Sequence, residues 1–66
     1  MTSYFVYVLL SLKDYKFYVG YTEDIEKRIS DHNKGNVLST KHRLPLILVH
    51  YEYFINKADA KAREVF

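Results

Sequence analysis

Two tyrosines in the N-terminal segment FVYVLLSLKDYKFYVGYT are the first side chains whose chemistry needs an explanation. The rest of this segment is typical of an apolar β-hairpin, in which phenylalanine would bury the same surface without a hydroxyl that must find a partner. Tyr7 and Tyr18 are therefore either core aromatics whose hydroxyls are hydrogen-bonded, or catalytic groups that accept or donate protons. A free tyrosine has a pKa near 10, so only about 0.1% is ionised at pH 7. A tyrosine base therefore needs a guanidinium or a divalent cation nearby.

A guanidinium and an imidazole occur one turn apart on an expected helix. Arg28 and His32 are spaced i, i+4, which places them on the same side of a helix. An arginine offers a fork of donors to a phosphate oxygen, but Arg28 is also placed to form a surface pair with Asp24, worth about 0.3–0.5 kcal/mol. His32 is either a cap or surface group, or a partner for a tyrosine or a phosphate. The three histidines of the chain lack the close spacing of a metal-binding pair.

The two tyrosines are expected to share one face of a sheet. Two segments rich in Val, Tyr and Phe predict adjacent strands, Tyr4–Leu10 and Phe17–Tyr21. A four-residue loop at Ser11–Asp14 pairs Leu10 with Tyr15. Because side chains alternate along a strand, this register places Tyr7 opposite Tyr18, with both hydroxyls on the same side.

The remaining elements complete a small α+β domain. Three more elements follow from the hydrophobic pattern: a helix at Thr22–Lys34, a strand at Leu46–Phe54 and a helix at Lys57–Phe66. Thr22 is the expected N-cap of the first helix, and Gly35 its terminator. Asn56 caps the second helix, whose inner face is expected to carry Ala58, Ala62 and Val65. The order β-β-α-β-α predicts a three-stranded antiparallel sheet flanked by helices. Residues 1–66 then form a single domain, which is either cut short in its last helix or frays there.

Composition narrows the class of protein. The 66 residues contain no cysteine, which leaves a dense apolar core as the source of stability; 48% hydrophobic residues suffice for one. The apolar run at Tyr4–Leu10 is too short to span a bilayer, so we expect a soluble, cytoplasmic protein. The formal charge of +2 is too weak to identify a nucleic-acid-binding protein. Basic side chains do gather in the middle of the chain, where a solvated loop is the alternative: Lys34, Lys41, His42 and Arg43.

The order and spacing of several motifs resemble a known family. FVY at Phe5–Tyr7, YVG at Tyr18–Gly20 and DIEKRISDHNKG at Asp24–Gly35 are similar to the GIY-YIG nuclease domain, and most similar to its small stand-alone members, the UPF0213 type. RLPLILVHYEYF and KADAKARE are similar to the rest of the same pattern. The resemblance implies the same three-stranded fold and the hydrolysis of phosphodiester bonds with one divalent cation, Mg²⁺ or Mn²⁺.

The resemblance also assigns roles to individual residues. The implied catalytic residues are Tyr7, Tyr18, Arg28 and His32. Glu64 falls at the position of the family's metal-binding glutamate, and a single carboxylate with water and phosphate oxygens commonly holds Mg²⁺. Contacts to the nucleic-acid backbone, which position the substrate without reading its sequence, are expected from Asn36, Lys41 and Arg43.

These observations predict a metal-dependent endonuclease that acts on nucleic acid, expected to be DNA. The first motif lacks its glycine, and Tyr21 stands where some repair-nuclease relatives carry a lysine. Two alternatives therefore remain open. One is a catalytically inactive nucleic-acid-binding module with the same fold, and the other is a protein-interaction domain that uses an exposed aromatic face.

Overall fold

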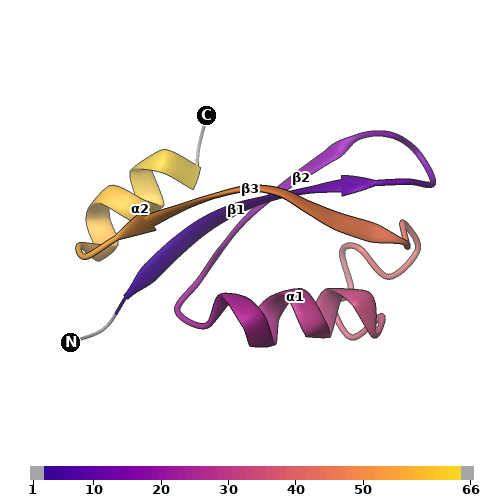
Figure 1. The fold of residues 1–66 in the computed structure, drawn as a ribbon, viewed down its shortest axis with the longest axis horizontal. Helices are drawn as coiled ribbons and strands as arrows, with labels where there is room; N and C mark the ends of the chain where they lie inside the picture. The colour runs from indigo at the N-terminus through magenta and orange to yellow at the C-terminus, as the bar shows by residue number, and fades with distance from the viewer. Residues whose placement is uncertain (1–2, 65–66) are drawn as a thin grey trace.

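The computed structural model describes residues 3–64, which fold into a three-stranded sheet with a helix on each face (Figure 1). Along the chain the elements are β1 (Tyr4–Ser11), β2 (Phe17–Thr22), α1 (Ile25–Asn33), β3 (Leu46–Phe54) and α2 (Lys57–Glu64). The strands are antiparallel in the order β2-β1-β3, so β1 is the central strand. The predicted fold class and order of elements are confirmed.

The register of the hairpin differs from the prediction by two residues. Tyr7 pairs with Gly20, and Leu9 pairs with Tyr18. The predicted loop was too short, because the Ser11 amide bonds to the Lys16 carbonyl at 3.0 Å and closes a longer turn. A shift of two residues keeps every side chain on its face, whereas a shift of one reverses it. The predicted pairing of the two tyrosines is thus wrong, but their shared face is correct.

Helix α1 begins at a different cap from the predicted one. Asp24 is the N-cap, and its Oδ1 accepts a hydrogen bond from the Lys27 amide at 3.1 Å. Thr22 ends β2, where its Oγ1 accepts from the Asp24 amide at 3.1 Å. An aspartate two residues on is an equally good cap, and it starts the helix after the strand has ended.

The end of α1 follows the prediction. Gly35 has a φ of 76°, a conformation that glycine adopts without strain. Its amide bonds to the His32 carbonyl and the Asn36 amide bonds to the Asp31 carbonyl, both at 3.0 Å. This pair of bonds is the Schellman arrangement, which satisfies the last carbonyls of a helix.

The loop between α1 and β3 is tied to the turn of the β1–β2 hairpin. The Ser11 hydroxyl donates to the Arg43 carbonyl at 2.7 Å, and the Leu12 amide donates to the Pro45 carbonyl at 2.9 Å. The Arg43 guanidinium adds an ion pair with Asp14 at 2.7 Å. These contacts hold the loop in place next to the C-terminal end of β1.

The core lies between the sheet and α1. Its buried residues are Tyr7, Leu9 and Leu46, and the residues that pack against them are Tyr18, Ile25, Ile29 and Leu44. On the other face, Ala60 is the buried residue of α2. The predicted inner face of this helix is wrong, because Ala58 and Ala62 are exposed and Val65 lies outside the described residues. In the described part of the chain, no helix has the length and apolar character needed to cross a membrane.

Candidate active site

Tyr7 is buried at the centre of the sheet, and its hydroxyl has a specific partner. The side chain is 1% exposed, and its Oη lies 2.8 Å from Nε2 of His32. His32 is also fully buried, in the last turn of α1. This hydrogen bond explains why phenylalanine does not replace Tyr7, since a buried hydroxyl is tolerated only with a partner.

Gly20 provides the space for the Tyr7 ring. A Cβ atom built on Gly20 would overlap with Cζ and Oη of Tyr7, so only glycine fits at this position of β2. The pairing of Gly20 with Tyr7 places the glycine under the ring. The glycine of the YVG motif is thus explained by packing, because the phenol covers the backbone where a side chain would otherwise stand.

We expect Gly20→Ala to lower the free energy of unfolding by about 1–3 kcal/mol, the usual cost of overpacking a filled core. The added methyl must displace the buried Tyr7 ring, because the two would otherwise overlap. Urea unfolding measures the loss, and the near-ultraviolet circular dichroism of the tyrosines reports the displaced ring. Gly35→Ala is the control, because it strains a positive φ but leaves Tyr7 untouched. A Gly20→Ala protein with native stability and spectrum would contradict the predicted overlap.

A third buried side chain extends the hydrogen-bonded chain. Oγ1 of Thr40 lies 2.7 Å from Nδ1 of His32, and Thr40 is fully buried. Both ring nitrogens of His32 are therefore occupied inside the protein. Sequence reasoning missed Thr40, because it lies in an irregular polar segment where nothing distinguishes it from Ser39.

Tyr18 completes a cluster of three rings. Its centroid lies 6.4 Å from that of Tyr7 and 5.2 Å from that of His32. Unlike its neighbours it is only half-buried, and its hydroxyl makes no hydrogen bond to another residue within 3–64. Tyr18 is therefore the phenol of this cluster that solvent or a ligand can reach.

Electrostatics keep the buried members of the cluster neutral. Burial raises the pKa of Tyr7 well above its ordinary value; the neighbouring Tyr18 and the charge of Glu64 also raise it, and Arg28 opposes them. Burial lowers the pKa of His32, Arg28 lowers it further, and Asp31 opposes them. At neutral pH Tyr7 keeps its proton and His32 carries a single ring proton. Arg28 therefore lowers the pKa of Tyr7, as a nearby cation should, but burial raises this pKa by more.

We expect the protein to lose stability as the pH falls below about 6.5 because of His32. In the unfolded chain this histidine binds a proton near its ordinary pKa, whereas in the folded protein its pKa is lower. The unfolded state therefore binds more protons in that range, and stability rises with pH there by at most about 1.4 kcal/mol per pH unit. Urea unfolding between about pH 7.5 and about pH 5 measures the slope. His32→Gln should flatten it and the exposed His42→Gln should not; equal slopes in both variants would contradict the prediction.

Arg28 lies on the exposed side of α1 and lines a polar pocket. The pocket has a volume of about 220 Å³ and is lined by Thr22, Asp24, Lys27, Arg28 and Asp31. Within residues 3–64 the Arg28 guanidinium forms no ion pair, so the pairing with Asp24 that the sequence allowed does not occur. Its charge lowers the pKa values of both Tyr7 and His32.

Glu64 belongs to the other helix, and its charge acts on one member of the ring cluster. It is the last described residue of α2, it is half-buried, and its charge raises the pKa of Tyr7. Across residues 3–64, no group of three or more His, Asp or Glu side chains is placed to hold a metal ion. A lone carboxylate nonetheless fits Mg²⁺, which takes one or two carboxylates and completes its shell with water and substrate phosphates.

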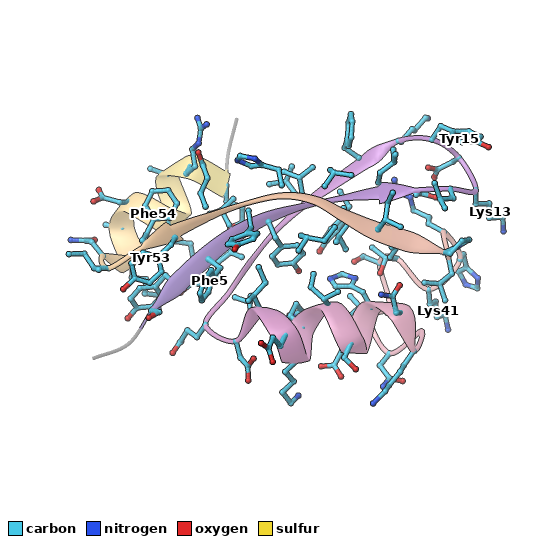
Figure 2. All side chains as sticks on the ribbon, viewed as in Figure 1. Phe5, Lys13, Tyr15, Lys41, Tyr53 and Phe54 are labelled. Atoms are coloured by element: carbon cyan, nitrogen blue, oxygen red, sulfur yellow. The ribbon has the colours of Figure 1, made fainter. Side chains whose placement is uncertain are left out.

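The three residues predicted to contact nucleic acid lie in the segment between α1 and β3. Asn36 and Lys41 are exposed, and Figure 2 shows Lys41 at the end of the molecule that carries Lys13 and Tyr15. Arg43 is partly buried in its ion pair with Asp14, and its Nη2 also donates to the Lys16 carbonyl at 3.0 Å. Arg43 therefore has a structural role in anchoring the loop, while the contacts of all three residues with nucleic acid remain predictions.

Comparison with known proteins adds to this geometry. The family described as the GIY-YIG catalytic domain matches residues 3–66. A UPF0213 protein of Clostridium perfringens is 43% identical over 63 residues, which are 94% of this chain and 67% of that protein. A UPF0213 protein of Staphylococcus haemolyticus is 42% identical over 97% of this chain and 78% of its own length, and one of Haloquadratum walsbyi is 37% identical over 97% and 73%. No solved structure matches the chain significantly.

Proposed function

Because the chain belongs to the GIY-YIG family, and within it to the UPF0213 proteins, we propose that it is a metal-dependent endonuclease that cleaves phosphodiester bonds in DNA. The family is of the nuclease type, which supports a nucleic-acid substrate. The observation that carries the proposal is the cluster of Tyr7, Tyr18 and His32 on one face of the sheet, within electrostatic reach of Arg28 and Glu64.

The two tyrosines have different roles in this proposal. Tyr18 is half-buried and its hydroxyl is free of internal partners, so it orients and helps to deprotonate the attacking water. Tyr7 is buried and protonated at neutral pH, so it acts as a hydrogen-bonding group rather than as the base. His32 holds the Tyr7 hydroxyl at 2.8 Å and assists proton transfer through it.

Arg28 binds the phosphate. Its exposed guanidinium presents two parallel donors to non-bridging oxygens, and its charge stabilises the negative charge that builds up in the transition state. Glu64 would hold the divalent cation, Mg²⁺ or Mn²⁺. When bound, this cation would neutralise the charge of the phosphate and stabilise the negative charge on the leaving oxygen. Lys41, Asn36 and Arg43 would contact the backbone of the substrate outside the site.

The test is cleavage of supercoiled plasmid and of single-stranded DNA and RNA, with Mg²⁺, with Mn²⁺ and with EDTA. We expect nicking of DNA that requires the cation, and we expect Glu64→Ala to abolish it. Glu26→Ala is the control, because Glu26 is an exposed acidic residue of α1 outside the ring cluster. Salt-sensitive binding without cleavage would instead indicate the inactive binding module.

A second candidate function is favoured by the surface of β3. This edge strand has no partner on its outer side among residues 3–64, and it exposes large apolar side chains: Ile47, Leu48, Val49, Tyr51 and Tyr53. An exposed apolar edge strand is a site of association between chains. A protein-interaction domain would self-associate as its concentration rises and would show no affinity for DNA in the same experiments.

A further inference from the structure

Tyr15 presents its ring to solvent in the turn of the β1–β2 hairpin. The residue is 75% exposed, and within residues 3–64 its hydroxyl forms no hydrogen bond and its ring contacts no other ring. Its backbone has a φ of 57°, in the left-handed region that Gly, Asn and Asp adopt most readily. Neither the turn nor the core explains a tyrosine here, because it strains the backbone and buries little surface.

Three exposed ammonium groups lie at the same end of the molecule. Lys13 and Lys16 flank Tyr15 in the hairpin turn, and Figure 2 shows Lys41 at the same end as Lys13 and Tyr15. Within the described residues none of the three lysines forms an ion pair. Together they exceed the formal net charge of +2 of the whole chain, so positive charge is concentrated here. We call these four residues the basic tip: Lys13, Tyr15, Lys16 and Lys41.

Internal bonds fix the backbone of the basic tip. Asp14, the acidic residue of this turn, pairs with Arg43 at 2.7 Å, so its charge is neutralised and does not repel an anion. Nη2 of Arg43 donates to the Lys16 carbonyl at 3.0 Å, and the Lys16 amide donates to Oδ1 of Asp14 at 2.9 Å. The ring and the ammonium groups are therefore presented from a preorganised turn, which lowers the entropic cost of binding a partner.

An exposed ring among ammonium groups fits a nucleic-acid strand whose bases are unpaired. Such strands are bound by stacking bases on aromatic side chains, while cations attract the phosphates. The bases of a duplex are already stacked on each other, so their faces are not available to a tyrosine. An acidic polypeptide would pair with the lysines, but it would leave the ring of Tyr15 unexplained.

We propose that the basic tip is a docking site for single-stranded DNA, in which a base stacks on Tyr15 and the lysines bind the flanking phosphates. Tyr15 precedes Tyr18 by three residues, which span at most about 11 Å even in a fully extended chain. A strand docked at the basic tip therefore extends to the phenol that faces the attacking water. The identity of the ligand as DNA rests on the proposed function, whereas the binding test does not require cleavage.

The direct test is stacking at position 15. The chain contains no tryptophan, so Tyr15→Trp introduces a single fluorophore at the basic tip. In EDTA, we expect a short oligothymidylate to quench its fluorescence, and the duplex of the same strand with oligoadenylate to quench it much less. Tyr53→Trp is the matched control, because Tyr53 is 53% exposed and lies at the opposite end of the molecule (Figure 2). No quenching at position 15, or equal quenching at position 53, would overturn the proposal.

The contribution of the ring to affinity is measured with Tyr15→Asn, which removes the ring and suits the positive φ, so the fold should be retained. We expect it to bind labelled oligothymidylate about 5- to 150-fold more weakly, the usual value of one stacked base. Tyr53→Asn should bind like the wild type, and Lys41→Ala should weaken both the affinity and its dependence on salt. Wild-type affinity in Tyr15→Asn would contradict stacking. Displacement of the oligonucleotide by poly-L-glutamate as readily as by unlabelled DNA would also overturn the proposal, because it would show a site for anions in general.

These outcomes are distinct from those of the cleavage assay. Cleavage without any effect of the Tyr15 variants would remove the docking site and leave the proposed function standing. Quenching and weakened binding without cleavage would establish the docking site on an inactive binding module. A protein that neither binds nor cleaves DNA would refute both proposals.

Discussion

Arg28→Ala is expected to reduce the rate of DNA cleavage about 100- to 1,000-fold, the usual effect of removing one preorganised donor to transition-state charge. The same change should alter the free energy of unfolding by less than about 0.5 kcal/mol, because surface residues without internal partners contribute little. Arg28 is exposed, lines the polar pocket and makes no ion pair within residues 3–64. Initial cleavage rates and urea unfolding measure the two effects separately.

Lys27→Ala is the matched control, because Lys27 is the neighbouring exposed cation of α1 and lines the same pocket. Its ammonium already pairs with Asp31 at 3.2 Å, so its loss should cost about 0.3–0.5 kcal/mol of stability and little activity. Arg28→Lys should recover part of the rate, since a lysine keeps the charge but loses the paired donors. Equal rates in Arg28→Ala and Lys27→Ala would remove Arg28 from the mechanism.

The elements of the fold were predictable because the hydrophobic pattern is strong in each of them. The bounds of β3 agree with the prediction, since Leu46–Phe54 is an apolar and aromatic run, interrupted by His50 and Glu52, directly after a proline. The hairpin register was not predictable, because it depends on a turn closed by Ser11 and Lys16 rather than on the strands themselves. The first cap failed for a similar reason: Thr22 and Asp24 are both good caps, and the length of β2 decides between them.

The site was predictable only where local geometry determines it. The shared face of Tyr7 and Tyr18 follows from strand parity, which survives a shift of two residues. The contacts of Gly20 and Thr40 depend on chain segments that meet only in the folded protein. The spacing of residues along the sequence therefore does not predict them. Burial of Tyr7 is likewise a tertiary property, and it reverses the direction in which a nearby arginine alone would move the pKa.

This burial separates two tyrosines that look equivalent in the sequence. Tyr7 has its hydroxyl satisfied inside the protein, whereas Tyr18 exposes part of its side chain and leaves its hydroxyl free of internal partners among the described residues. A phenol held in the interior is suited to transmit or hold a proton. A phenol at the surface is suited to meet water and phosphate. Substitution of Tyr18 should therefore reduce activity and leave stability nearly unchanged, whereas substitution of Tyr7 should reduce stability.

Tyr18→Phe is expected to lower the cleavage rate by about 100-fold or more, since general-base groups contribute roughly 10²- to 10⁴-fold. Its stability should stay close to that of the wild type, because the lost hydroxyl makes no hydrogen bond within residues 3–64. Tyr7→Phe is the contrast, because it leaves Nε2 of His32 buried without a partner. It should lower the free energy of unfolding by about 1–3 kcal/mol. Cleavage rates and urea unfolding of both variants give the comparison. A Tyr18→Phe protein that cleaves at the wild-type rate would transfer the base to another group, and equal stability losses in both variants would contradict the difference in burial from which their roles are inferred.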